Sequence, residues 1–300
     1  MKQAVSVSLG SDLRDAEARI NLFGEDVYLR REGWNGDPQA VKQRFLELDG
    51  RVDAFGVGGI DLWVYSQTAR YPLHSAHALT DGVIQTPVVD GSGLKHTLER
   101  ETASAVDRML GPGHQKRRVL LTSALDRQGM AQSFFEKGYD VLCGDLGFAL
   151  GLPIPIRSRR VLSWVARVIL PIVSRLPIHM IYPTGSAQNE TIPKFETWYK
   201  WADIIAGDCL YIKRHMPDDM GGKIVITNTT TEEDRSRFGN RGISRLITTT
   251  PVLNGRSFGT NLFEAGLTAV AGKGRPLSRG ELKQMITELQ LKPEEYLLTP

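Results

Sequence analysis

A glycine-rich turn flanked by an acid and a base stands at residues 90–95, DGSGLK, where a short apolar run gives way to a helical stretch. Its two glycines allow backbone amides to approach an anion, and Lys95 adds a charge or a titratable amine. A lysine near a carboxylate works as a general acid or base, so we predict Lys95 as catalytic, assisted by Asp90 or Asp61. The spacing G-x-x-x-x-G-K-[ST] of triphosphate sites is absent. The alternative is a tight turn that leaves Lys95 in solvent.

The loop after the next strong apolar run occupies the place of the first turn in a dinucleotide-binding unit. Such a unit carries an acid about 20 residues further on that bonds the ribose, and Asp145 stands in that neighbourhood. The glycines of G-x-G-x-x-G are replaced by Ala124 and Asp126, with Gly129 as the third. An aspartate beside a pyrophosphate is unfavourable unless Arg127 neutralises it. An ordinary β-α-β unit without a nucleotide is the alternative. The candidate cofactor-binding residues are Ser123, Asp126, Arg127, Gly129, Asp145 and Thr229.

The stretch from Gly255 into the next predicted helix holds the most ligand-like set of donors. A guanidinium fork, hydroxyls and free helix amides bind phosphate or carboxylate, and two glycines let the backbone close on the ligand. The residues that supply them are Arg256, Ser257, Thr260 and Asn261. A structural turn is the alternative. The histidines are scattered and the two cysteines lie far apart in the sequence, so we predict no metal site.

The elements that must position these residues follow a β-α rhythm. Short β-branched runs alternate with helix-like stretches, which predicts parallel strands with crossover helices. We expect a two-lobed α/β protein: a mixed-sheet α/β domain over 1–114, a Rossmann-like parallel-sheet domain over 115–255, and C-terminal helices over 256–300 that return to the first lobe. The predicted strands are 4–9, 52–57, 87–89, 118–122, 140–143, 179–182, 203–206, 223–227 and 245–249. Hairpins are expected over 20–30 and 62–73, and one helix over 94–110.

The composition excludes several classes of protein. With 300 residues, 41% hydrophobic and 24% charged, the chain is neither disordered nor fibrous. A net charge of +3 is too small to indicate a nucleic-acid partner. Two cysteines and an N-terminus without a long apolar core favour a cytoplasmic location.

One segment is unlike the rest, because residues 146–189 hold five arginines and no acid. We interpret 146–177 as a basic apolar insertion in the Rossmann-like domain, and residues 161–176 within it are apolar around most of a helical wheel. Arg167 and Pro171 interrupt it too strongly for a bilayer span. A wide apolar arc favours a helix buried in the protein or in a homodimer interface through 157–176, and a membrane surface is the less favoured alternative.

The order of these loops resembles that of the shikimate and quinate 5-dehydrogenases. That family opens with a strand whose serine motif holds the substrate carboxylate, and Ser6 and Ser8 stand in its place. The segment 90–95 is similar in position to the catalytic-lysine loop, and 123–129 to the cofactor turn. The cofactor and catalytic motifs are largely degenerate, since the glycine-rich turn and the N-V-T-x-P-x-K stretch are not present as written.

The resemblance implies an oxidoreductase that uses NAD or NADP and acts on a small hydroxy-carboxylate. It implies that Ser6 and Ser8 hold the carboxylate, while Lys95 exchanges the proton. The alternative is a non-redox two-lobed enzyme or binding protein for a phosphorylated or carboxylated ligand in the cleft between the lobes. Its anion sites are the segments 91–95 and 256–261. Both hypotheses predict a small anionic substrate.

Overall fold

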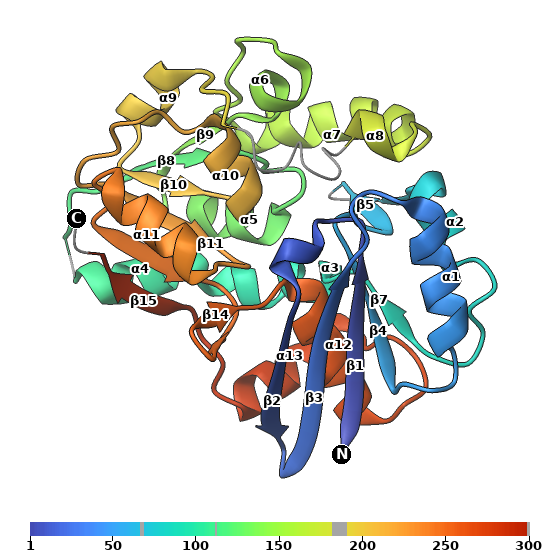
Figure 1. Cartoon of the computed structure of the whole chain (residues 1–300). Coiled ribbons are helices and arrows are strands. Elements are labelled where there is room, and N and C mark those ends of the chain that lie inside the picture. Colours follow the sequence, from blue (N-terminus) through green and yellow to red (C-terminus); the bar gives the residue numbers. More distant parts are fainter. Residues whose placement is uncertain (67–68, 112, 182–190, 299–300) are drawn as a thin grey trace. The chain divides into compact units, whose positions relative to one another are not determined.

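The computed structural model describes residues 1–66, 69–111, 113–181 and 191–298 and divides the chain into two compact units (Figure 1). Unit 1 comprises Met1–Leu94, Arg167–Gln188 and Gly259–Gln290. Unit 2 comprises Lys95–Ala166, Asn189–Phe258 and Leu291–Pro300. Each unit contains a sheet dominated by parallel pairs, which confirms the predicted α/β class with two lobes.

Unit 1 is built on a five-stranded sheet in the order β2-β3-β1-β4-β7. β2 pairs with β3 in the antiparallel sense and the other pairs are parallel, so the sheet is mixed, as predicted. β1 and β4 are almost wholly buried, because helices cover both faces, which is typical of parallel strands. The strands are β1 (Lys2–Ser8), β2 (Ala16–Leu22), β3 (Glu25–Gly33), β4 (Ala54–Gly58) and β7 (Val88–Val89).

Two helices fix the core of unit 1. In α1 (Pro38–Leu48), Asp37 accepts bonds from two first-turn amides, and Phe45 meets Phe55 of β4 edge-on with ring centroids 5.1 Å apart. In α12 (Thr260–Ala271), nearly every side chain is buried because the helix packs on β1, β3 and β4. The remaining elements are η1 (Asp12–Arg14), β5 (Trp63–Tyr65), β6 (Arg70–Pro72), α2 (His74–Thr80), α8 (Ile178–Ile181) and α13 (Arg279–Glu288).

Unit 2 is built on a six-stranded sheet in the order β15-β12-β11-β10-β8-β9. All its pairs are parallel except the edge pair of β12 with β15. The chain adds β9 on one side of β8 and then β10 on the other, so the strand order reverses between β8 and β10. In doubly wound sheets ligands bind beyond the carboxyl ends at such a point. The strands are β8 (Arg118–Leu121), β9 (Asp140–Cys143), β10 (Ile204–Ala206), β11 (Ile224–Thr227), β12 (Arg245–Thr248) and β15 (Glu294–Leu297).

The core of unit 2 lies between this sheet and its helices. It includes Leu120, Tyr199, Ile205, Val225 and Phe238, all fully buried. The helices are η2 (Leu98–Glu101), α4 (Thr102–Leu110), α5 (Gln128–Glu136), α6 (Asp145–Leu150), α9 (Glu196–Trp201), α10 (Cys209–His215) and α11 (Glu232–Asn240). A small hairpin pairs β13 (Val252–Leu253) with β14 (Arg256–Ser257). Two helices contain a unit boundary: α3 (Ser92–His96) and α7 (Arg159–Val173).

Three predictions about the elements need correction. The boundary falls at Leu94 and Lys95, not at 114 and 115, because η2 and α4 pack against α5 of unit 2. The end of the chain is not purely helical, since 291–300 belongs to unit 2 and supplies β15. The strand predicted over 179–182 is the helix α8 as far as Ile181, and residue 182 lies outside the described residues. Pro177 precedes this helix, and its fixed φ favours a first helical turn.

Candidate functional site

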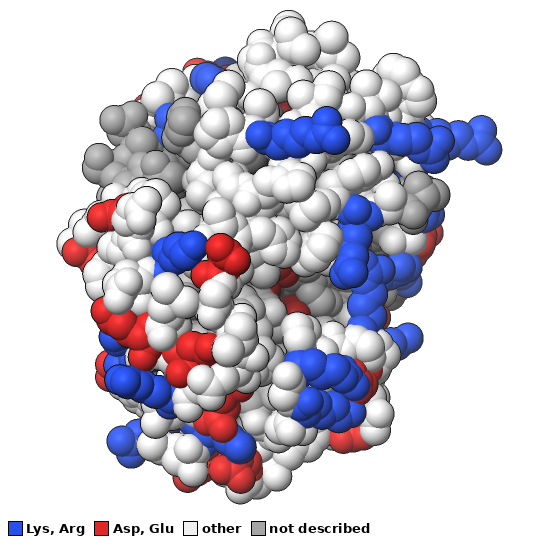
Figure 2. Space-filling model, turned by 90° about the vertical axis from the view of Figure 1, so that its right-hand side faces the viewer, with Lys and Arg blue, Asp and Glu red and all other residues white. Residues whose placement is uncertain are grey.

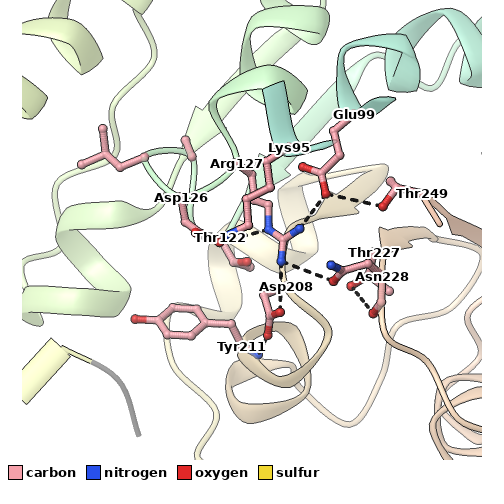
Figure 3. A network of polar contacts seen from close by, with 12 residues as sticks. Lys95, Glu99, Thr122, Asp126, Arg127, Asp208, Tyr211, Thr227, Asn228 and Thr249 are labelled. Atoms are coloured by element: carbon pink, nitrogen blue, oxygen red, sulfur yellow. Dashed lines mark hydrogen bonds and ion pairs between the residues drawn. The ribbon is translucent and has the colours of Figure 1, made fainter. Parts of the chain in front are cut away.

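The polar side chains of unit 2 gather at the carboxyl edge of its sheet (Figure 3). Each of the strands β8, β10, β11 and β12 is followed by a residue of this group, while α3 and η2 add two more. The members are Lys95, Glu99, Thr122, Asp126, Arg127, Asp208, Asn228 and Thr249. Because parallel strands all end at the same edge, a polar residue just after each strand brings this set together.

Arg127 is the centre of the group, with a side chain only 4% exposed. Its Nη1 donates to Glu99 Oε1 at 2.6 Å, and its Nε donates to Asp126 Oδ2 at 3.0 Å. Its Nη2 donates to Asp208 Oδ2 at 3.2 Å and to the Asn228 side-chain oxygen at 3.3 Å. One guanidinium therefore ties three loops of unit 2 to η2, and its position is fixed by three carboxylates and an amide.

Lys95 and Asp126 form a short ion pair beside this centre. Lys95 Nζ donates to Asp126 Oδ1 at 2.6 Å, with the lysine side chain 8% and the aspartate side chain 20% exposed. Since Asp126 also accepts from Arg127 through its other oxygen, its carboxylate is held between two cations. The neutralisation of Asp126 by Arg127 that the sequence required is present. The predicted catalytic lysine thus has a carboxylate partner, but a different one from those predicted.

Glu99 is the most deeply buried acid of the group. Its side chain is 0% exposed, and burial raises its pKa, while Arg127 and Lys95 act in the opposite direction. Oε1 accepts from Arg127 and, at 3.5 Å, from the hydroxyl of Thr249. Oε2 has no hydrogen-bond partner among the described residues. A buried oxygen without a donor is costly, so this carboxyl depends on Arg127 for its stability.

The sum of charges in the group decides what kind of ligand it suits. Three carboxylates, Glu99, Asp126 and Asp208, face two cations, Lys95 and Arg127, and all five are joined by ion pairs. Cations already paired with carboxylates offer little attraction to a phosphate. Hydroxyls, by contrast, donate to carboxylates and accept from a lysine or an amide. The group therefore suits an uncharged, hydroxylated part of a ligand better than a phosphate.

Asp145 bears on the predicted dinucleotide site. Its carboxylate accepts from the backbone amides of Leu125 at 2.8 Å and Ala124 at 3.2 Å, and burial raises its pKa to about 6. These are amides of the turn that passes a pyrophosphate in a dinucleotide-binding unit. Gly129 is explained by packing, because a Cβ there would collide with the Lys95 carbonyl oxygen. With its amides bound to a carboxylate and Asp126 alongside, this turn does not fit a pyrophosphate as it stands.

The other predicted catalytic acids lie in unit 1. Asp90 accepts from the amides of Leu62 at 2.8 Å, Trp63 at 3.2 Å and Ser92 at 2.9 Å, so it organises its own turn. Asp61 is buried in the same unit. The glycines of the DGSGLK turn are explained by close packing on α12, since a Cβ at Gly91 would collide with Thr260. The structural interpretation therefore accounts for the glycines of this turn.

The predicted carboxylate-holding serines lie at the end of β1, together with part of the predicted substrate-binding set. Ser6 Oγ accepts from Asn261 Nδ2 at 2.6 Å, next to Thr260 at the start of α12. Ser8 Oγ accepts from Arg31 Nη2 at 3.2 Å, and burial lowers the pKa of Arg31 to about 10. Unit 1 thus holds a second polar group, which carries an arginine that the sequence argument missed.

The remaining predicted residues lie at the hairpin and loops of unit 2. Ser257 is fully buried, and its hydroxyl accepts from the Thr230 amide at 2.7 Å. Arg256 lies over the ring of Phe258, with 5.7 Å from its guanidinium carbon to the ring centroid. Thr229 has a left-handed φ of 55°. The predicted set 256–261 is divided, because 256–258 belong to unit 2 and 259–261 to unit 1.

Five residues of the group were not singled out as site residues: Glu99, Thr122, Asp208, Asn228 and Thr249. Glu99 could have been found from its spacing, because it stands four residues after Lys95 in the predicted helix and so shares its face. The other four end a predicted strand or follow it within two residues, which is the place where side chains converge. No group of three or more His, Cys, Asp or Glu side chains within the described residues could hold a metal ion.

Comparison with protein families accounts for almost the whole chain. Residues 3–90 match a model described as a domain of unknown function (DUF8753), and residues 93–297 match a domain of unknown function (DUF8754). The chain belongs to the DUF8754 family. The two matched ranges meet next to the boundary between the units at Leu94 and Lys95. No curated protein matches the chain.

Among solved structures, a Mycobacterium smegmatis protein in complex with beta-D-fucofuranose is 8% identical, with a TM-score of 0.36 over 99% of this chain and 92% of that one. The NAD-dependent malic enzyme of Thermotoga maritima is 11% identical, with a TM-score of 0.40 over 99% and 79%. A galactofuranose binding protein is 11% identical, with a TM-score of 0.34 over 99% and 94%. Likenesses at these values say nothing about ligand or activity.

Proposed function

We propose that this protein is an enzyme that performs acid–base chemistry on a small hydroxylated molecule at the carboxyl edge of the unit 2 sheet. The supporting observation is the 2.6 Å pair of Lys95 and Asp126, held from the far side by the buried Arg127. An amine fixed in this way is preorganised to exchange a proton with an oxygen that approaches it. The surrounding carboxylate and amide groups offer acceptors and donors for further hydroxyls.

In this mechanism Lys95 gives a proton to a carbonyl oxygen of the ligand or takes one from a hydroxyl. Asp126 stabilises the ammonium form of the lysine and keeps Nζ in place. Arg127 is a positioning residue, because it fixes Asp126 and, through Asp208 and Asn228, the loops after β10 and β11. A group that exchanges the proton, Lys95, is thus oriented by a neighbouring carboxylate, Asp126, as is common in acid–base catalysis.

Dehydrogenation of a hydroxy-carboxylate with NAD or NADP, as in the shikimate and quinate 5-dehydrogenases, is the more specific version of this function. The reversal of strand order between β8 and β10 favours it, because dinucleotides bind at that point in doubly wound sheets. The engagement of the Ala124 and Leu125 amides by Asp145 opposes it. Titration with NADH and NADPH, followed by nicotinamide fluorescence, separates the two versions. Absence of binding of either nucleotide at millimolar concentration excludes the dehydrogenase version of the function.

A thermal-shift screen tests the broader proposal. The wild type is melted with quinate, shikimate, myo-inositol and glucose at millimolar concentrations, since a ligand that binds only the folded state raises the melting temperature. We expect at least one compound to give a shift that is lost in Lys95→Met and Asp126→Asn.

The matched control is Lys213→Met. It breaks a second buried lysine–aspartate ion pair of unit 2, which Lys213 forms with Asp234. This variant should be less stable and should keep the shift. No shift with any compound, or an equal shift in Lys95→Met, contradicts the proposal.

A further inference from the structure

The outer side of α7 is an apolar stripe in solvent. Val161, Trp164, Val168 and Ile172 recur at helical spacing and are 48%, 64%, 47% and 63% exposed. More than half of the exposed large hydrophobic side chains of the described residues lie between 150 and 180. Scattered single hydrophobic residues are normal on a surface, but an aligned row of this kind marks an interaction site.

The inner side of the same helix explains why the sequence favoured burial. Leu162, Val165, Ala166 and Leu170 are at most 7% exposed, so only half of the wide apolar arc is used for packing. The other half forms the exposed stripe. The expectation of a buried helix therefore holds for one side of α7 and fails for the other.

Positive charge lies along one edge of this stripe. Arg160 and Arg167 stand four residues before and three residues after Trp164, so both lie beside it on the helix surface, and both are exposed. No acid occurs anywhere in 146–189. Figure 2 shows, on the face that it presents, long blue side chains that stand out from a largely white surface.

These observations favour an anionic membrane surface over a second copy of the chain. Two copies that met through this stripe would bring arginines against arginines with no acid from the same segment to compensate. A tryptophan flanked by arginines on an apolar helix face suits the boundary between headgroups and acyl chains, where its ring is half immersed. No helix of the described residues is long and apolar enough to cross a bilayer. A helix of this kind would lie in the plane of the surface.

We propose that the outer stripe of α7 docks on an anionic phospholipid surface. Trp164 and its apolar neighbours enter the headgroup boundary, and Arg160 and Arg167 bind lipid phosphates. The proposal is independent of the chemistry at Lys95.

Vesicle sedimentation with the full chain tests it, using phosphatidylcholine vesicles with and without phosphatidylserine. We expect the protein to sediment with the anionic vesicles only, and less so at high salt. Trp164 emission should shift to the blue as its indole leaves water. Trp164 should dominate this change because the other four tryptophans are already half-buried. Trp164→Ser should abolish the shift. Arg160→Gln with Arg167→Gln should weaken binding about thirty-fold, from about 1 kcal/mol for each arginine at the surface.

The control is Ile84→Ser, which removes an 87% exposed hydrophobic residue outside this segment and should bind as the wild type does. Equal binding by Trp164→Ser overturns the proposal, as does a protein that stays in the supernatant with unchanged emission. A concentration-dependent dimer in sedimentation velocity that Trp164→Ser abolishes also overturns it, because a second copy then covers the stripe.

Discussion

Replacement of Arg127 by methionine tests whether its guanidinium holds the polar group of unit 2 together. The change keeps most of the side-chain volume but removes the donor at 2.6 Å from the fully buried Glu99 and the links to Asp126 and Asp208. Removal of one partner of a buried ion pair costs about 3–5 kcal/mol, because the other charge stays buried without compensation. We expect a loss of this size in the free energy of unfolding at pH 8, measured by urea denaturation with circular dichroism.

The loss should depend on pH with a definite sign. Burial already raises the pKa of Glu99, and Arg127 opposes that rise, so the pKa must rise further in the variant. A carboxyl group with a raised folded-state pKa takes up a proton on folding, and its stability contribution falls as the pH rises through that pKa. Arg127→Met should therefore be closer to the wild type at pH 5 than at pH 8.

Glu99→Gln in the same background gives the control. It removes the buried charge, so the double variant should be more stable at pH 8 than Arg127→Met alone. A loss below about 1 kcal/mol, or one equal at pH 5 and pH 8, refutes the reasoning, since a buried carboxylate left alone costs more than that.

Further predictions concern other groups. Asp145→Asn should flatten the dependence of stability on pH between about pH 4 and 6. The folded-state pKa of Asp145, about 6, lies above the unfolded value, so the wild type loses stability as the pH rises through this range. Urea midpoints at each pH measure the slope, and an unchanged slope contradicts the burial argument. Gly207→Ala should lower the melting temperature sharply, because φ is 147° and a Cβ would overlap the Thr122 hydroxyl, whereas Gly138→Ala, with an open surround, should cost less. Equal losses would show that the contact with Thr122 does not matter.

The class of the fold could be predicted from the sequence because its signal is local. The run 119–121 is apolar and 224–227 is β-branched, and each is followed by a polar loop, which is the pattern of buried parallel strands. The failures have physical causes. The helix predicted over 94–110 breaks at Thr97, with φ −118° and ψ −74°, and no glycine or proline marks the break. β15 was missed because EEYL carries two acids and has its partner far away in the sequence.

The candidate site was predicted in part for the same reason. Asp126 and Arg127 lie in a loop that the β-α rhythm marks, Lys95 lies in the short helix after another such turn, and the three meet in one network. Their partners could not be chosen from the sequence, because pairing depends on strand order: Lys95 meets Asp126, 31 residues away, and not the nearby Asp90. Glu99 was passed over because an acid in a predicted helix is usually on the solvated face, although its spacing of four residues from Lys95 placed both on one face of that predicted helix.

The most direct test of the central claim is a crystal structure of the protein soaked with the compound that gives the largest thermal shift. The account predicts a ligand oxygen within hydrogen-bond distance of Lys95 Nζ, about 2.6–3.2 Å, with Asp126 still paired to the lysine. A ligand whose atoms contact neither Lys95 nor the carboxyl edge of the unit 2 sheet, for example one bound at Ser6 and Arg31 alone, contradicts it.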